Sequence, residues 1–147
     1  MKKLLIILSA FCLYACADSE TSSPEQKIRK TLSTIEDGIE NRSLSQVIDN
    51  ISDDYSDHQG RVKKDIKRLT QFQILKNQNI HLFTRIKSIE VNDGYASIEL
   101  SSAMTSLNID LSIEANRIKA NSYKTSLVLK NESGDWRVIS SSWQRGW

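Results

Sequence analysis

The sequence is poor in the residues that build the most recognisable catalytic motifs. It has five glycines, one proline, two cysteines and two histidines among 147 residues. No GxSxG, P-loop or dinucleotide-binding glycine pattern occurs. The two histidines, His58 and His81, lack the helical pair spacing of a zinc site. We therefore expect no metal site and no cofactor.

An excess of charge of one sign is also lacking. The chain has 20 basic and 18 acidic residues, and Lys2 and Lys3 account for the whole difference. A neutral chain gives no electrostatic footprint for nucleic acid. The locally basic residues 61–68 place their charges at the polar positions of an amphipathic helix, which is typical of a solvated face. We expect no nucleic-acid partner.

The first sixteen residues have the order of a secretory signal. Met1, Lys2 and Lys3 precede a mostly apolar run over residues 4–14, and Ala15 and Cys16 follow it. The run is shorter than the roughly 20 apolar residues that a membrane-spanning helix needs. A short buried helix is the alternative, but nothing polar interrupts the run to give it a wet face.

The junction resembles the lipobox of bacterial lipoproteins, although Tyr14 is bulky for that motif. The matching residues are Leu13, Tyr14, Ala15 and Cys16. The resemblance implies that Cys16 is lipidated, that Cys12 leaves with the signal peptide, and that multiple acyl chains anchor the protein stably. Ala17 after the cysteine implies the outer membrane, facing the periplasm. We predict a signal peptide over residues 1–15, a tether over 16–23 and one domain over 24–147.

Helices are expected in the first half of that domain. Ser23 and Gln26 form a capping box with Pro24 at the first helical position, which predicts a helix over residues 24–40. Ser43 and Gln46 repeat the capping pattern and predict a shorter helix that ends near Ser52. A third helix is expected to run to about residue 76, with Val62, Ile66, Leu69 and Phe72 on its inner face.

Strands are expected from residue 80 onward. Residues 80–91 are rich in β-branched side chains, and Gly94 closes a hairpin turn before an alternating strand with Ala96, Ile98 and Leu100 inward. Residues 107–113 alternate equally cleanly, and residues 123–130 and 136–144 predict a second hairpin. Helices followed by a strand meander predict an α+β fold with N-terminal helices packed on a curved antiparallel sheet.

This order of elements resembles the NTF2-like domains (SnoaL-like, cystatin-like cone) over residues 24–144. Two motifs carry the resemblance: Asp53-Asp54-Tyr55 between the second and third helices, and the closing strand from Gly134 to Val138. The resemblance implies a cone with a pocket between sheet and helices. It leaves function open, because such cones host isomerases, dehydratases, cyclases and non-catalytic modules. Residues 108–122 are longer than a simple connection and can form an arm or a flap.

One polar cluster offers candidate chemistry. Tyr55, Asp57 and His58 lie together in the sequence, and Asp57 could raise the pKa of the His58 imidazole to make an acid–base pair. The resemblance implies that this loop lies at the mouth of the cone. The alternative is local: Asp57 or Ser56 starts the third helix, Gly60 makes its turn and His58 faces water.

Aromatic residues of the strands are candidates for binding. The candidate pocket residues are Tyr55, His58, Tyr123, Trp136 and Trp143. Trp136 and Trp143 are seven positions apart and face opposite sides of a regular strand, so one should be in the core and the other outward. An outward tryptophan would suit a homodimer through the sheet face. A β-bulge would instead put both inward.

Three functions remain open at this stage. The first is a non-catalytic envelope lipoprotein that binds a small ligand or an envelope protein. The second is an isomerase, dehydratase or cyclase that uses Asp57 or His58 as base and Tyr55 as hydrogen-bond donor. The third is an assembly role in which residues 108–122 grip a larger envelope complex.

Overall fold

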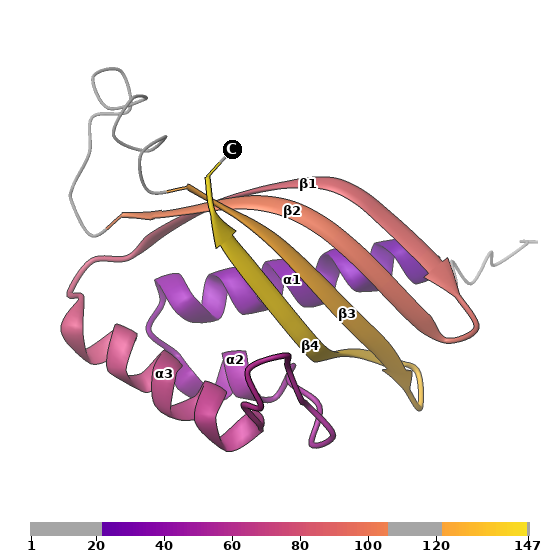
Figure 1. Ribbon diagram of the computed structural model, residues 1–147, viewed down its shortest axis with the longest axis horizontal. Coiled ribbons are helices and arrows are strands. Elements are labelled where there is room, and N and C mark those ends of the chain that lie inside the picture. Colours follow the sequence, from indigo (N-terminus) through magenta and orange to yellow (C-terminus); the bar gives the residue numbers. More distant parts are fainter. Residues whose placement is uncertain (1–21, 106–121, 147) are drawn as a thin grey trace, which may run out of the picture.

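The computed structural model describes residues 22–105 and 122–146. Three helices, α1 (Pro24–Glu40), α2 (Leu44–Ile48) and α3 (Lys63–Lys76), precede four strands. The strands β1 (His81–Asn92), β2 (Tyr95–Thr105), β3 (Ser122–Glu132) and β4 (Asp135–Arg145) form one antiparallel sheet in the order β1-β2-β3-β4. Figure 1 shows the long strands curving over α1, with all three helices on the same side of the sheet. The predicted α+β fold, with helices on a curved antiparallel sheet, is confirmed.

The first helix begins as its capping box predicts. Ser23 Oγ accepts a hydrogen bond from the Gln26 amide at 3.2 Å, and Gln26 Oε1 accepts one from the Ser23 amide at 2.8 Å. These bonds supply acceptors for amides that have no partner inside the helix. Ile28 and Leu32 are the buried apolar residues of α1, and Ile35 and Ile39 continue the same face against the core.

The second helix is shorter than predicted. It ends at Ile48, and Ser43 makes no side-chain cap. The chain leaves the helix because its next residues pair with the free edge of β4. The Val138 amide donates to the Asn50 carbonyl at 3.0 Å, and the Ser52 amide donates to the Val138 carbonyl at 2.9 Å. Residues 50–56 thereby cover part of an edge that would otherwise be open to another strand.

The third helix differs from prediction in its inner face. Val62, Leu69 and Phe72 were expected inward, but each is more than 40% exposed. Ile66 packs against the core and Ile74 is buried, so the inner line of α3 runs at intervals of four residues through positions 66, 70 and 74. The prediction took steps of three residues after Ile66. Because a helix turns about 100° per residue, such steps drift around the helix and away from the inner line.

Both predicted hairpins are present. Asp93 and Gly94 have φ values of 46° and 78° in the β1–β2 turn, as a two-residue turn of this hairpin type requires. Ser133 and Gly134 occupy the equivalent β3–β4 turn, with φ values of 56° and 102°. The predicted strand over residues 107–113, most of the 108–122 arm, the signal peptide, Cys16 and Trp147 lie outside the described residues.

The core lies between α1 and the concave face of the sheet. Its most deeply buried apolar side chains include Ile28 from α1, Ile98 from β2 and Leu129 from β3, all with no exposed surface. Trp136 and Val138 from β4 close one end, together with Ile51 and Tyr55 from the strip that covers the β4 edge. We call residues 50–56 the β4-edge strip. Its pairing with β4 brings Tyr55 and its neighbours Asp57 and His58 to the sheet.

Candidate functional site

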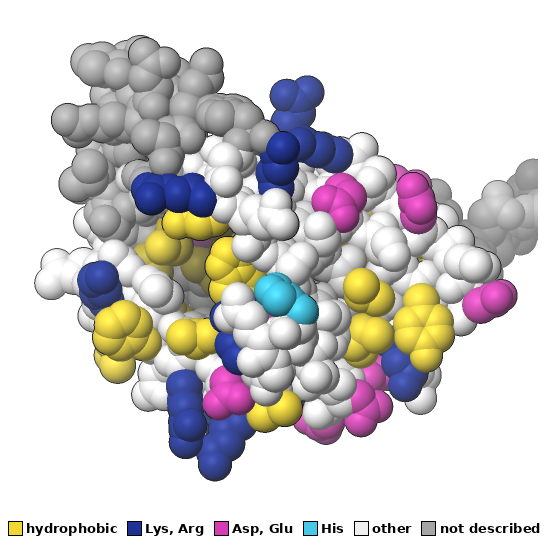
Figure 2. Space-filling model, viewed as in Figure 1, with side chains coloured by type: hydrophobic (Ala, Val, Ile, Leu, Met, Phe, Trp, Pro, Cys, Tyr) yellow, Lys and Arg dark blue, Asp and Glu magenta, His cyan; other side chains and the backbone are white. Residues whose placement is uncertain are grey.

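A cavity of about 260 Å³ opens between the helices and the concave face of the sheet. Its apolar lining comes from α1, the β4-edge strip, α3 and the strands, and includes Leu32, Ile35, Ile39, Ile51, Ile66, Leu82, Leu100, Leu127 and Val138. Figure 2 shows hydrophobic side chains gathered around a hollow between the sheet and α3. Space of this kind, apolar and largely preformed, is typical of small-molecule sites.

A few polar side chains interrupt the apolar wall. The Thr84 hydroxyl donates to the Glu36 carboxylate, which joins β1 to α1. Ser102 and Thr125 share a hydrogen bond of 3.2 Å across β2 and β3. Each of these residues lines the cavity, so a ligand that enters it meets hydroxyl groups on an otherwise apolar surface.

Tyr55 joins this cavity to a buried ion pair. Its hydroxyl lies 2.6 Å from Ser141 Oγ of β4 and donates to Asp57 Oδ2 at 3.2 Å. The geometry follows from the β4-edge strip, since the Ser56 amide bonds the Ile139 carbonyl at 3.0 Å and holds residues 55–57 beside the strand. Tyr55 is only 2% exposed.

Asp57 is surrounded by hydrogen-bond donors. Arg61 Nε lies 2.6 Å from Asp57 Oδ2, and the Gln59 and Arg61 amides donate to Asp57 Oδ1 at 2.9 and 3.1 Å. Burial by itself raises the pKa of Asp57, but the bonds from Arg61, Gln59 and Tyr55 outweigh it and lower the pKa to about 2. A carboxylate held this firmly in its charged form is a poor proton acceptor at neutral pH. The geometry gives Asp57 a structural role.

The pKa of Tyr55 moves the other way. Burial is the largest cause and raises the pKa of the phenol above its ordinary value, and the nearby charge of Asp57 acts in the same direction. The hydroxyl therefore stays protonated at neutral pH and acts as a hydrogen-bond donor to Asp57. It can also accept a bond from Ser141.

The depressed pKa of Asp57 makes stability sensitive to acid. Because the folded-state pKa of about 2 lies below the ordinary 3.8, the folded state favours the charged form. The contribution is present above pH 3.8 and is lost as the pH falls through about 2. We expect the unfolding free energy of the wild type to fall over this window more than that of Asp57→Asn, measured by urea denaturation at several pH values. Parallel pH profiles for the two proteins would contradict this assignment.

His58 is not brought to the cavity. Its side chain is exposed and borders a different hollow, beside β4, with Ser140 and Ser142. Asp57 points inward and His58 outward, so the two do not form the acid–base pair that the sequence suggested. Tyr55 and Asp57 converge beside the cavity, but the His58 side chain does not join them there.

The two strand tryptophans lie on the same face of the sheet, contrary to the expectation for a regular strand. The register of β3 and β4 shifts between Val128 and Leu129, so that Ile139 is an extra residue between paired Val138 and Ser140. This β-bulge reverses the alternation beyond it. Trp143 consequently pairs with Thr125, a cavity-lining residue, instead of facing outward.

The candidate aromatics differ in their contacts. Trp136 is 3% exposed and belongs to the core, whereas Trp143 is 42% exposed, with the Arg61 guanidinium 4.2 Å from its ring centroid. This contact is a cation–π interaction. Tyr123 is half-buried on the cavity-facing side of β3 near the start of the strand, but it does not line the cavity. Of the five candidate pocket residues, Tyr55 alone lines it.

Sequence reasoning missed several residues of this arrangement. Arg61 was assigned to a solvated helix face, yet its side chain is only 18% exposed and connects Asp57 to Trp143. Glu36 and Ser141 were not singled out at all. The ion pair of Asp57 and Arg61 closes the turn at Gly60, and an acidic and a basic residue on either side of a glycine turn were the local signal that could have found it. The contacts of Glu36 and Ser141 depend on long-range packing.

Residues 22–105 and 122–146 contain no cluster of three or more histidine, cysteine, aspartate or glutamate side chains that could hold a metal ion. No helix in that part of the chain is long and apolar enough to cross a membrane.

Comparison with solved structures identifies the fold. A cystatin-like domain of unknown function from Nostoc punctiforme PCC 73102 matches with a TM-score of 0.67 and 13% identity, over 86% of this chain and 80% of that one. An NTF2-like protein of unknown function from Shewanella oneidensis MR-1 matches with a TM-score of 0.63 and 10% identity, over 82% and 98%. The chain has the NTF2-like cone fold.

A third match belongs to the same fold. A putative calcium/calmodulin-dependent protein kinase type II association domain from Thiobacillus denitrificans has a TM-score of 0.62 and 11% identity, over 82% of this chain and 93% of that one. No protein-family model and no curated protein sequence matches this chain. At these identities the NTF2-like likeness concerns the fold alone, so function must be argued from the cavity.

Proposed function

We propose that this NTF2-like protein is a non-catalytic binding protein of the bacterial envelope, whose cone cavity holds one small, largely apolar molecule. The single observation that carries the proposal is the composition of the cavity wall, which is apolar except for a few hydroxyls and Glu36. Pockets that bind small molecules have this composition, in which a few polar groups set the orientation of the ligand.

The size of the cavity limits the ligand. An apolar cavity of about 150 Å³ is large enough to bind benzene, and this cavity measures about 260 Å³. A molecule of one or two rings, or a short branched chain, suits that space. One hydroxyl or carbonyl group on it would meet Ser102, Thr125 or the Thr84–Glu36 pair.

A binding role is favoured over catalysis by the state of the polar groups. Asp57 is held ionised by four donors, and the Tyr55 hydroxyl is already bonded to Asp57 and Ser141. An isomerase, dehydratase or cyclase would need an available base on the cavity. Exposed His58 does not supply one. The Glu36 carboxylate on the cavity wall already accepts a hydrogen bond from the Thr84 hydroxyl.

The ligand class can be tested with 2-naphthol, a two-ring apolar molecule that carries one hydroxyl. We expect a chain that begins at Ser22 to bind it saturably with one molecule per protein, followed by the fluorescence of the probe. Chemical-shift changes should be confined to residues that line the cavity, such as Ile35 and Leu127. Non-saturable binding, or shifts concentrated on the exposed face of α3, would contradict a cavity site.

The proposed cellular location rests on the sequence. The resemblance of Leu13, Tyr14, Ala15 and Cys16 to a lipobox supports a lipid anchor, and Ala17 supports the outer membrane, facing the periplasm. A cysteine carrying several acyl chains would hold the protein on the membrane stably.

The two cysteines allow a matched test of the anchor. We expect Cys16→Ser to abolish the lipid mass on the intact protein and to block removal of residues 1–15. The same substitution at Cys12 should leave the mature mass unchanged, because Cys12 belongs to the predicted signal peptide. Intact-mass spectrometry of the three proteins from a bacterial membrane fraction distinguishes them. Lipid on the Cys16→Ser protein, or none on the wild type, would contradict the proposed anchor.

Partner binding stays a prediction. A homodimer through the outer face of the sheet draws support from the likeness to an association domain, but it no longer has an outward tryptophan to support it. Residues on that face include small polar side chains such as Ser97, Ser101 and Ser126. Sedimentation of the chain that begins at Ser22 would check the dimer. The arm predicted for an assembly role lies outside the described residues except for Ser122.

A further inference from the structure

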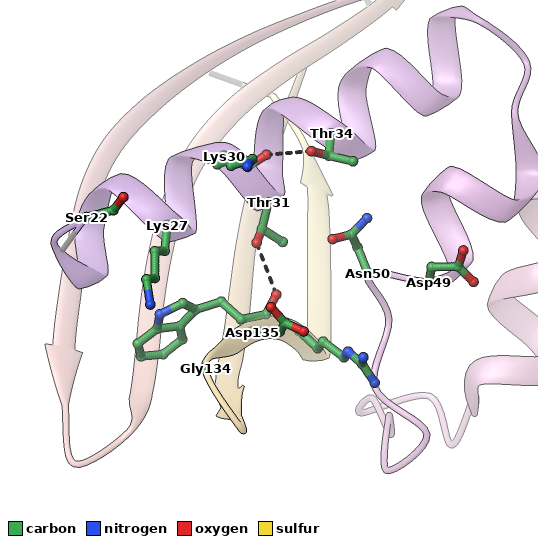
Figure 3. A pocket seen from close by; sticks show the side chains of 11 residues that line it. Ser22, Lys27, Lys30, Thr31, Thr34, Asp49, Asn50, Gly134 and Asp135 are labelled. Carbon is green, nitrogen blue, oxygen red and sulfur yellow. Dashed lines mark hydrogen bonds between the residues drawn. The ribbon is translucent and has the colours of Figure 1, made fainter. Parts of the chain in front are cut away.

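A second hollow, of about 490 Å³, lies apart from the cone cavity between α1 and the β3–β4 turn. Lys27, Lys30 and Thr31 line it from α1, Asp49 from the end of α2, and Asp135 and Trp136 from the start of β4. In Figure 3 Lys27 extends from α1 toward the turn at Gly134. We call this hollow the polar groove. It is separate from the cone cavity, because the two share no lining residue.

The groove contains a buried hydrogen-bond donor without an acceptor. Trp136 is 3% exposed, and its indole Nε1 has no hydrogen-bond partner among the described residues. Its position is held from the backbone, because the Thr31 hydroxyl donates to the Trp136 carbonyl at 3.1 Å. A buried tryptophan usually finds a hydrogen-bond partner for its N–H, and a buried donor without an acceptor costs free energy. The unpartnered indole therefore points to an acceptor that a ligand could supply.

Two lysines from successive turns of α1 line the groove. Lys27 and Lys30 make no ion pair with any residue in 22–105 or 122–146. Arg137 also lines the groove, but it is engaged with Glu132 at 3.4 Å. Lys27 stands in the first turn of α1, where the helix dipole adds to the positive potential, and Lys30 stands in the second turn.

The carboxylates of the groove restrict where an anion can bind. Asp49 and Asp135 also line it. Figure 3 shows Lys27 and Asp49 at opposite ends of the groove, with Asp135 between them. The Lys27 end lies farthest from Asp49 and to one side of Asp135, so repulsion from the two carboxylates together is weakest there, and this end is the one suited to negative charge.

We propose that the polar groove binds an oxyanion, a phosphate or carboxylate group of a small ligand, at its Lys27 end. Lys27 and Lys30 supply the charge, and Trp136 Nε1 donates a hydrogen bond once the ligand supplies the acceptor. Charge-assisted bonds of this kind are shorter and stronger than neutral ones. The site depends on the described residues alone and stands whether or not the cone cavity binds a ligand.

The oxyanion has two chemically equivalent sources. One is a free phosphate compound, and the other is the phosphate of a lipid headgroup. Ser22 lines the groove, and the six residues from Cys16 to Ser22 can span at most about 20 Å. If Cys16 carries lipid, as proposed above, the groove lies close enough to a membrane surface for a headgroup to reach it.

The indole N–H of Trp136 is a direct spectroscopic reporter of this site. The full-length protein is studied in a maltoside detergent, which contributes no phosphate, with Trp143→Phe and Trp147→Phe leaving Trp136 as the single indole. Inorganic phosphate is titrated in one arm and dihexanoyl-phosphatidylglycerol in the other. We expect the indole proton resonance to shift downfield and saturate in at least one arm. A shift in both arms indicates a free phosphate site, and a shift with lipid alone indicates a headgroup site.

Two lysine variants separate a built site from general ionic attraction. Lys27→Gln should weaken phosphate binding by about tenfold or more, since it removes a charge-assisted bond. Lys64→Gln removes an exposed lysine from α3 and should leave the dissociation constant within about twofold, because distant surface charges are screened by salt. The proposal is overturned if the Trp136 resonance fails to saturate in both arms, or if the two variants weaken binding equally.

Discussion

Replacing Asp57 with asparagine is expected to lower the free energy of unfolding by about 3–5 kcal/mol at neutral pH, the usual cost of breaking a buried ion pair by removing one partner. The Asp57 side chain has no exposed surface, and the Arg61 side chain is only 18% exposed. Without Asp57 the guanidinium keeps its charge, while Nη2 is already buried without a hydrogen-bond partner among the described residues. Urea denaturation followed by circular dichroism measures the loss.

The same substitution at Asp53 is a matched control. Asp53 also pairs with a cation, Lys63, at 2.8 Å, but its side chain is 89% exposed. Exposed pairs of this kind contribute little to stability, so Asp53→Asn should unfold close to the wild type. The double variant Asp57→Asn/Arg61→Met should recover part of the loss, because it removes the unpaired charge together with its partner.

Two results would contradict the structural role of Asp57. One is an unfolding free energy for Asp57→Asn as close to the wild type as that of Asp53→Asn. The other is a double variant less stable than Asp57→Asn by the full cost of a separate Arg61 change, since independent residues have additive effects. Either result would make Asp57 a candidate catalytic group again.

Filling the cone cavity is expected to block ligand binding. Thr125 lines the cavity on β3, so Thr125→Trp would place an indole where the ligand is proposed to bind. We expect the affinity for 2-naphthol to fall by about tenfold or more, equivalent to about 1.4 kcal/mol of binding free energy. A fluorescence titration of the chain that begins at Ser22 measures the change.

Ser126→Trp is the control for this experiment. Ser126 is the next residue on β3 and lines the outer hollow beside His58, on the other face of the sheet from the cavity. Successive side chains of a strand alternate between faces, so the same large side chain is introduced one position along without entering the cavity. Equal loss of 2-naphthol binding in both variants would show that the probe does not report on the cavity. Thermal unfolding of each variant checks that both remain folded.

The local parts of the fold could be predicted from the sequence because local interactions determine them. Ser23, Pro24 and Gln26 start α1 through bonds within one turn. Asp93-Gly94 and Ser133-Gly134 close hairpins because these residues tolerate positive φ. The α+β architecture follows from the order of these elements along the chain.

The features that failed depend on contacts distant in sequence. Residues 50–56 leave α2 early to pair with β4, more than 80 positions later. The bulge at Ile139 turns Trp143 toward the helices, and no residue type in Trp136–Gln144 signals that insertion. The inner face of α3 is likewise chosen by its packing against the core, which left Leu69 and Phe72 exposed.

The candidate site was predicted in part for the same reason. The sequence placed Tyr55, Asp57 and His58 in one loop, and the structure brings Tyr55 and Asp57 beside the cavity while His58 faces solvent. Tyr55 and Asp57 are two positions apart, on either side of Ser56, and both are buried, whereas His58 is the immediate neighbour of Asp57 and begins the exposed turn. Glu36, Ser102, Thr125 and Ser141 come from four separate elements, so no short motif identifies the cavity wall.

Native mass spectrometry of the full-length protein, extracted from its own membrane in mild detergent, tests the central claim most directly. A cone that holds one small apolar molecule predicts a species heavier than the lipidated chain by one non-covalent adduct. Thr125→Trp should lose that adduct and Ser126→Trp should keep it. The account would be contradicted if the wild type and both variants each appeared only at their own adduct-free mass, with no saturable binding of 2-naphthol.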